Sequence, residues 1–333
     1  MRTIVPTVVR GALLAIAAIL TLLSVVTSSS PRCENTSRPM QPIYTCVGFT
    51  SAGHFADLIE RSFSEDPQLT FVLTDSVLSE IPAEAFENVP VHILELSNVT
   101  VKSFGSTAGD ASGSEDVLLS GGLEDTLEKL VFRDRSSLPA TWASMKNLKK
   151  LKILRMFNMV SLQLTADFNA LADSLTVVEV LQSSIVRMDE DWLAGVIGLE
   201  SLVIRGCNLK VFQRSMLPRP AANLWNLDFV INNLTTLPDD FGEGFPALRF
   251  LDLGSNSLST VSKASLAALI DAPLEAIELG GNPLVCDCAI KHLRAFPSQL
   301  LSADCHAPES LRRKLVHTLT DEDLQCDAVD GAR

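Results

Sequence analysis

The sequence predicts an α/β solenoid, a curved horseshoe with a parallel sheet on its concave side and an irregular or short-helical convex side. Three observations predict this fold. A short apolar frame returns every 24 to 26 residues through the C-terminal two thirds of the chain. The last five copies of the frame have a small polar or amide residue at a fixed place near their end. Cysteines lie on both sides of the repeats, where an open stack needs covering.

The frame is clearest in the segment LRFLDLGSNSL, which begins at Leu248 and has the spacing L-x-x-L-x-L-x-x-N-x-L. Its central L-x-L predicts a short strand whose inward side chains pack on the strand of the next turn, because one turn cannot bury that face alone. The copies begin at residues 127, 151, 175, 199, 224, 248 and 274. The repeats are predicted to occupy 67–285 in about nine turns.

The ninth position of each frame needs a side chain that satisfies backbone groups inside the coil. Asn232, Asn256 and Asn282 supply amides there, and Cys207 is a small substitute that we expect to be a buried free thiol. In the earlier turns the frame puts this ladder position on Ser76, Val99, Arg135 and Met159. Valine and methionine cannot replace an amide, so waters, backbone shifts or another register are expected in those turns.

The N-terminus predicts export from the cell. Residues 1–28 have the layout of a cleaved secretory signal, with Arg2 and Arg10 flanking an apolar run of 16 residues that is shorter than the ~20 needed to cross a bilayer. An uncleaved signal anchor is the alternative. The tail, 327–333, is short and polar and resembles no lipid-anchor signal. We therefore expect a secreted, extracellular protein that has no membrane association after signal cleavage.

Charge and sequons agree with this location. The formal net charge is −13, and removing Arg2 and Arg10 leaves 25 basic against 40 acidic residues, which is −15. A nucleic-acid partner is disfavoured, because such binding depends on a basic surface. N-glycosylation is predicted at three sequons, Asn35, Asn98 and Asn233. A Gly/Ser-rich stretch, 105–122, is predicted to be a surface loop inserted in one turn.

The segment NPLVCDC, followed by two later cysteines, resembles the cysteine-rich C-terminal flank of extracellular leucine-rich repeat proteins of the slit, Toll and Nogo-receptor type. The resemblance implies a C-terminal cap over 286–326 with the bridges Cys286–Cys305 and Cys288–Cys326; spacing alone leaves three connectivities open. An N-terminal cap over 29–66 is predicted to contain a bridge between Cys33 and Cys46. This cap departs from the family pattern, which usually has four cysteines.

No catalytic motif is evident. A zinc site formed by Cys286, Cys288, Cys305 and His306 is the chemical alternative to the bridges, but a secreted chain exposes thiols to oxidation and the paired C-x-x-C spacing is absent. The remaining histidines have no nucleophile motif beside them, and no glycine-rich phosphate loop is present. We predict a protein that is not an enzyme and that has no cofactor and no metal.

The repeat register predicts which side chains face outward on the concave sheet. Several are apolar or arginine, which favours a contact patch for an extracellular protein partner. These residues are Arg133, Arg155, Phe157, Leu181, Arg205, Trp225 and Val230. The alternatives are that they pack against one another or that the register is off by one. The predicted function is a protein-binding module.

Two other functions remain open from the sequence. The layout is similar to arthropod secreted repeat proteins that are likened to the non-catalytic subunit of a shrimp luciferase, which implies an accessory or scaffold subunit of a secreted enzyme. A soluble innate-recognition protein, resembling a receptor ectodomain, is the third possibility.

Overall fold

The structure is a computed structural model, and it describes residues 30–59, 68–104 and 122–326. The predicted signal over 1–28, the tail over 327–333 and the predicted insertion up to residue 121 lie outside these ranges.

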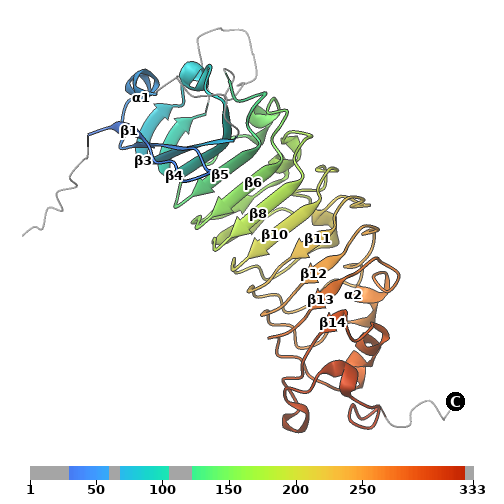
Figure 1. Cartoon of the computed structure of the whole chain (residues 1–333). Helices are drawn as coiled ribbons and strands as arrows, with labels where there is room; N and C mark the ends of the chain where they lie inside the picture. The colour runs from blue at the N-terminus through green and yellow to red at the C-terminus, as the bar shows by residue number, and fades with distance from the viewer. Residues whose placement is uncertain (1–29, 60–67, 105–121, 327–333) are drawn as a thin grey trace, which may run out of the picture.

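The predicted fold class is confirmed: the chain is a curved stack of turns with one long sheet along its length (Figure 1). The sheet runs in the order of the chain, because each turn places its strand beside that of the turn before. Its strands are β1 (Arg32–Asn35), β2 (Ile43–Val47), β3 (Leu69–Glu80), β4 (Val91–Ser103), β5 (Lys129–Arg133), β6 (Ile153–Phe157), β8 (Val177–Leu181), β10 (Ser201–Arg205), β11 (Asn226–Asp228), β12 (Phe250–Asp252), β13 (Ala276–Glu278) and β14 (Leu301–Ser302). All neighbours are parallel except the β1–β2 pair.

The remaining sides of each turn contain short elements. A second, two-stranded parallel sheet pairs β7 (Leu162–Leu164) with β9 (Ile185–Met188). The helices are α1 (Ala52–Leu58), α2 (Lys263–Ala267) and the 3-10 turns η1 (Ala83–Phe86), η2 (Trp142–Met145), η3 (Ala166–Ala170), η4 (Arg214–Met216), η5 (Cys288–Ala295), η6 (Glu309–Leu311) and η7 (Val316–Thr318). A turn of about two dozen residues that includes a strand leaves no room for longer helices.

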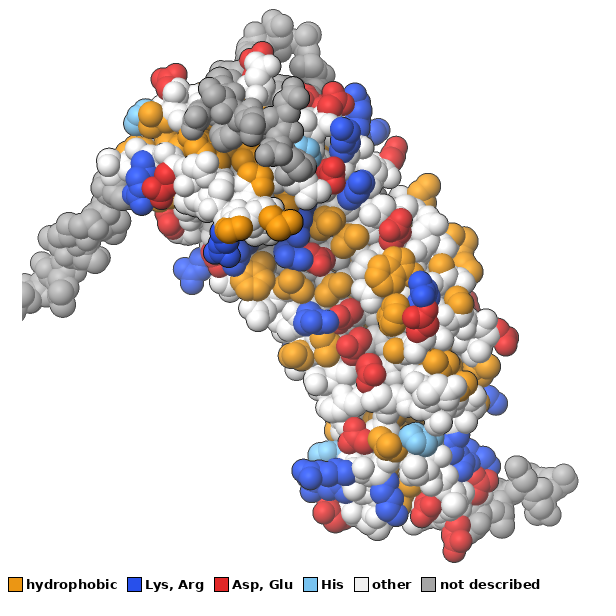
Figure 2. Space-filling model, viewed as in Figure 1, with side chains coloured by type: hydrophobic (Ala, Val, Ile, Leu, Met, Phe, Trp, Pro, Cys, Tyr) orange, Lys and Arg blue, Asp and Glu red, His pale blue; other side chains and the backbone are white. Residues whose placement is uncertain are grey.

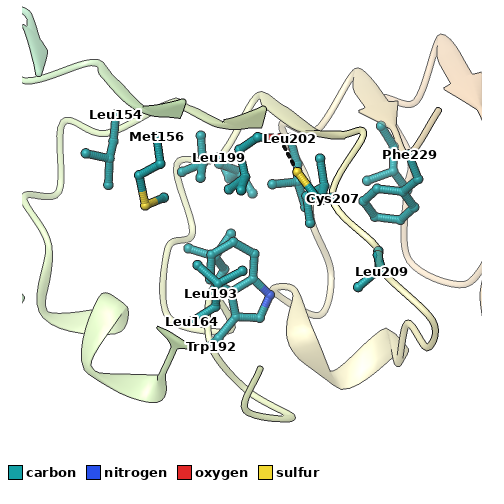
Figure 3. Close-up of a cluster of buried hydrophobic side chains, with 14 of the residues drawn as sticks. Leu154, Met156, Leu164, Trp192, Leu193, Leu199, Leu202, Cys207, Leu209 and Phe229 are labelled. Atoms are coloured by element: carbon teal, nitrogen blue, oxygen red, sulfur yellow. Dashed lines mark hydrogen bonds between the residues drawn. The ribbon is translucent and has the colours of Figure 1, made fainter. Parts of the chain in front are cut away.

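The core runs through the inside of the stack. Inward residues of the L-x-L motif are buried in turn after turn, as Leu154 and Met156 are on β6. Figure 3 shows Leu154, Met156, Leu199 and Leu202 facing Leu164, Trp192 and Leu193 from the opposite wall. Burying one such side chain contributes about 1.5–3 kcal/mol, so the apolar frame accounts for the stacking.

The ladder follows the prediction in the C-terminal turns. The Asn256 amide donates to the carbonyls of Phe229 and Leu253, which belong to two successive turns, and its oxygen accepts from Leu234 N–H at 3.0 Å. Asn232 and Asn282 bond in the same way. Cys207 is buried and free; its Sγ accepts from Ser183 N–H and lies 3.2 Å from the Val180 carbonyl.

The register predicted near residue 135 is wrong by one residue. The ladder position is Ser136, whose Oγ bonds the carbonyls of Leu96 and Arg133. Asp134 and Arg135 both have positive φ, so the chain inserts one extra residue before the ladder. Val99 and Met159 have no polar side chain at the ladder position. Their backbone N–H groups are instead satisfied by the next turn, because they donate to Ser136 Oγ and Ser183 Oγ at 3.0 Å each.

The N-terminal cap is a hairpin. β1 and β2 pair antiparallel with Cys33 directly opposite Cys46, and these two cysteines form a disulfide. β2 then pairs parallel with β3, so the main sheet begins inside the predicted cap. α1 places Phe55 in an edge-to-face contact with Phe49, their ring centroids 5.2 Å apart. This aromatic cluster covers the first turn.

The C-terminal cap closes the other end with the disulfides Cys286–Cys305 and Cys288–Cys326, the same pairs that the resemblance implied. η5 begins at Cys288 and buries Ile290 and Leu293 against the last turn. β14, inside the cap, pairs with β13, so the sheet also extends beyond the predicted end of the repeats. Between 67 and 285, nine strands of the main sheet are described.

Candidate functional site: the concave face

The outward residues of the sheet form straight rows, because parallel strands in register stack equivalent positions side by side. The row nearest the strand ends contains Arg133, Phe157, Leu181 and Arg205 as direct neighbours. Val230 follows them just after β11 and is partly buried. Arg133, Phe157, Leu181 and Arg205 therefore form one contiguous row, and we call this row, together with Val230, the strip.

The arginines are not free charges. Arg133 pairs with Glu95 at 2.9 Å, and its guanidinium lies 4.9 Å from the centroid of the Phe157 ring. Arg155, in the middle row, pairs with Glu179. Arg205 pairs with Asp228, and this hydrogen bond raises the pKa of Arg205. Each ion pair joins two neighbouring turns. The pairs therefore link adjacent strands of the sheet, and they also lie beside the strip.

Trp225 lies apart from the strip. Trp225 lies just before the first residue of β11, whereas the strip lies at the C-terminal ends of the strands. In addition, β8 and β10 separate β11 from β6. Its ring contacts Phe250 edge-on, with centroids 6.0 Å apart, and the side chain remains 40 % exposed. The predicted patch therefore divides into the strip and a separate aromatic pair.

The C-terminal half of the concave face is acidic. The middle row there contains Asp228, Asp252 and Glu278 on successive strands. Burial raises the pKa of Asp252, and the nearby carboxylates of Asp228 and Glu278 raise it further. Figure 2 shows orange and blue side chains over β6 to β10 and red side chains over β11 to β13. The face thus has opposite character at its two ends.

A hollow of about 360 Å³ lies at the N-terminal end of this face, and we call it the N-terminal hollow. Its walls come from the cap hairpin and from β3 to β8. Charged side chains in it are Glu95, Lys129, Arg133 and Arg155. Phe157 and Leu181 of the strip form part of its apolar lining. The hollow and the strip are therefore one continuous surface.

One residue per turn, directly after the outward row, has a left-handed backbone. We call this set the left-handed column, and its members are Asp75, Asn98, Asp134, Asn158, Gln182, Gly206, Ile231, Ser255 and Gly281. Glycine, asparagine and aspartate tolerate that region, whereas a β-branched residue is an outlier there. Ile231 is nevertheless in the column, with φ 57° and 58 % exposure.

Sequence reasoning missed the partners of the arginines and missed Lys129. Glu95, Glu179 and Asp228 occupy the same middle row as Arg155, and Lys129 occupies the first row. The signal that could have found them was the register itself, since the same counting that selects Arg155 also selects these acids. Attention to apolar and arginine residues alone left them out.

The predicted sequons all lie at exposed positions. Asn98 is in the left-handed column, where its Nδ2 donates to Asp75 Oδ1 at 2.7 Å. Asn35 ends β1, and its Oδ1 accepts from Ser37 N–H. Asn233 directly follows the ladder residue Asn232. Their glycosylation stays a prediction.

No group of three or more His, Cys, Asp or Glu side chains within the described residues is arranged to hold a metal ion. None of their helices is long and apolar enough to cross a membrane.

The fold is a leucine-rich repeat solenoid with disulfide-bonded caps at both ends. A family model described as leucine rich repeat matches residues 222–284, the most regular turns. The mouse (Mus musculus) trophoblast glycoprotein is 29 % identical over 136 residues, which are 32 % of each chain. Toll-like receptor 9 of Canis lupus familiaris is 32 % identical over 135 residues, 38 % of this chain and 13 % of that receptor.

Among solved structures, the chain is similar to one in the octameric complex of latrophilin 3, Unc5D and the leucine-rich repeats of FLRT2. The TM-score is 0.54 at 19 % identity, with 78 % of this chain and 83 % of that chain covered, which shows a shared fold. The matches to the trophoblast glycoprotein and to the receptor span a third or less of those proteins' lengths.

Proposed function

We propose that the protein is a secreted protein-binding module that recognises an extracellular protein through the concave face. The observation that carries the proposal is the strip: Phe157 and Leu181 lie side by side on the solvent face of a rigid sheet, with Arg133 and Arg205 at its ends. Apolar groups beside arginine, at the centre of a curved surface, are typical of contact hot spots. Similarity to the leucine-rich repeat structure assembled with latrophilin 3 and Unc5D supports a binding role.

The proposed mechanism is shape and charge complementarity between the sheet and its partner, with no covalent bond made or broken. The stacked turns hold the outward rows in fixed positions, so a partner binds without first ordering the surface, and less entropy is lost on association. Charge pairs such as Arg133–Glu95 keep long side chains in place at the rim of the strip.

The experiment begins with capture of proteins from extracellular fluid on the immobilised mature chain, read by mass spectrometry. Phe157→Asp and Leu181→Asp are then compared with the wild type for affinity to each captured protein. We expect each change to weaken binding by about 2 kcal/mol, roughly 30-fold, because a charge in a desolvated contact removes a hot spot. The melting temperature should stay nearly unchanged.

The matched control is Ile197→Asp, since Ile197 is 77 % exposed and lies outside the concave face. This variant should bind like the wild type. Equal affinity of all variants for every captured protein would contradict the proposal. Capture of a small catalytic chain would instead support the accessory-subunit alternative, and binding of microbial glycans would support innate recognition.

A further inference from the structure

The N-terminal hollow has more positive than negative groups. Lys129, Arg133 and Arg155 lie in it, and Glu95 and Glu179 neutralise the two arginines. Lys129 has no carboxylate within ion-pair distance in the part of the chain that the structure describes. One cation is therefore left over, in a chain whose formal net charge is −13.

Lys129 is held in an unfavourable position for a lone cation. Burial lowers its pKa and the positive charge of Arg155 lowers it further, whereas the carboxylates of Glu179 and Glu95, which already pair with Arg155 and Arg133, raise it. It lies in the first outward row between Ile93 and Ile153, so apolar side chains flank it on both neighbouring strands. A cation that is partly desolvated and lacks a partner gains more from an added carboxylate than an exposed one does.

The other walls of the hollow are apolar. Ile43 of the cap hairpin, Ile93, Phe157 and Leu181 line it. On the same face, Asp228 is neutralised by Arg205, but Asp252 and Glu278 have no ion pair among the described residues and repel negative charge from the C-terminal half. A negatively charged group of a bound protein is thus favoured at one end of the concave face and disfavoured at the other.

From these observations we propose that the N-terminal hollow receives an Asp or Glu side chain of the partner protein, next to an apolar side chain. Lys129 forms the ion pair with that carboxylate, and the adjacent apolar group covers Phe157 and Leu181. The acidic row sets the direction of the partner along the sheet. This inference rests on the proposed function, because it names the chemistry of the surface that binds there.

The test uses a library of short displayed peptides, selected on the immobilised mature chain and, in parallel, on Lys129→Met. Lys150→Met is the control, because it removes the same charge from an exposed residue that has no ion pair among the described residues and does not line the hollow. Peptides selected by the wild type and by Lys150→Met should be enriched in Asp or Glu beside an aliphatic or aromatic residue. Lys129→Met should lose that enrichment, and Lys129→Arg should keep it.

Affinities of the enriched peptides separate this inference from the proposed function. Lys129→Met should weaken them by about tenfold or more and reduce their salt dependence, since a charge pair is removed. If Lys129→Met binds like the wild type while Phe157→Asp does not bind, the face binds proteins and the carboxylate inference is wrong. If neither variant changes binding, the proposed function itself fails. Equal displacement of the peptides by acetate and by chloride supports recognition of the whole peptide, whereas selective displacement by acetate shows a site for any small anion.

Discussion

Ile231 shows at the scale of one residue how position in a turn can oppose side-chain preference. Its neighbours in the left-handed column are Gly206 and Ser255, and most other members are Asp, Asn or Gly. Isoleucine in this backbone region brings Cβ close to the following carbonyl and costs roughly 1–2 kcal/mol. The side chain is largely exposed, so little packing offsets that cost. Its position can be read from the repeat, but its backbone conformation cannot.

Replacing Ile231 with Asn should therefore raise the free energy of unfolding by about 1 kcal/mol, because asparagine tolerates the left-handed region. Urea unfolding followed by circular dichroism measures the change. Val211→Asn serves as the control, since Val211 is 60 % exposed but has no left-handed backbone, and its stability should not rise. A loss of stability in Ile231→Asn would mean that the isoleucine packs usefully.

At the scale of elements, the residue type at the ladder position changes along the stack, but each type satisfies backbone groups inside the coil. Serine serves it at Ser136 and Ser183, a thiol at Cys207 and amides from Asn232 onward. Another polar element lies on the convex side, where buried Arg214 donates to the carbonyls of Glu243 and Pro218 and stacks on Phe245. Burial lowers the pKa of Arg214 to about 10. No sequence pattern indicated this arginine.

Cys207 provides the test of the ladder. Cys207→Val should destabilise the protein by about 1–3 kcal/mol, because the Ser183 N–H loses its acceptor inside the core. Cys207→Ser should cost less, since Ser183 fills the same position one turn earlier with a hydroxyl. Denaturant unfolding measures both variants. Equal stability of the two would show that the sulfur contributes only volume, and thiol labelling of the wild type should require unfolding because Cys207 is buried.

At the scale of the whole molecule, the caps determine whether the stack persists. Each turn contacts only its neighbours, so the last turn has an apolar side that nothing in the repeat covers. Ile290, Leu293 and Leu324 are buried in the C-terminal cap against that side. The bridges join positions 13, 19 and 38 residues apart.

Loop length predicts the order of the bridges. Removing Cys288–Cys326 with paired alanines should cost about 4 kcal/mol and removing Cys286–Cys305 about 3 kcal/mol, because the longer bridge restricts the unfolded chain more. Removal of Cys33–Cys46 should cost least. Chemical unfolding of the three variants under oxidising conditions gives the comparison, and a reversed order would contradict the loop-entropy account.

Much of the fold could be predicted from local pattern, and the site only in part. The frame that begins at Leu248 and its ladder residue Asn256 recur so regularly that the strand positions can be predicted by counting residues. Counting failed at Arg135, because one extra left-handed residue shifts the register without any apolar residue to mark it. It succeeded for Phe157 and Leu181, which lie in turns of regular length.

The sequence by itself determined the stacked turns, the buried ladder and which side chains face outward, because these depend on spacing within one turn. Only the tertiary structure decided that Arg133 binds Glu95, that Trp225 lies apart from the strip and that Lys129 has no carboxylate partner among the described residues. Such contacts join residues from different turns. Their geometry depends on how successive turns superimpose, and that registration is a property of the packed stack rather than of any one repeat.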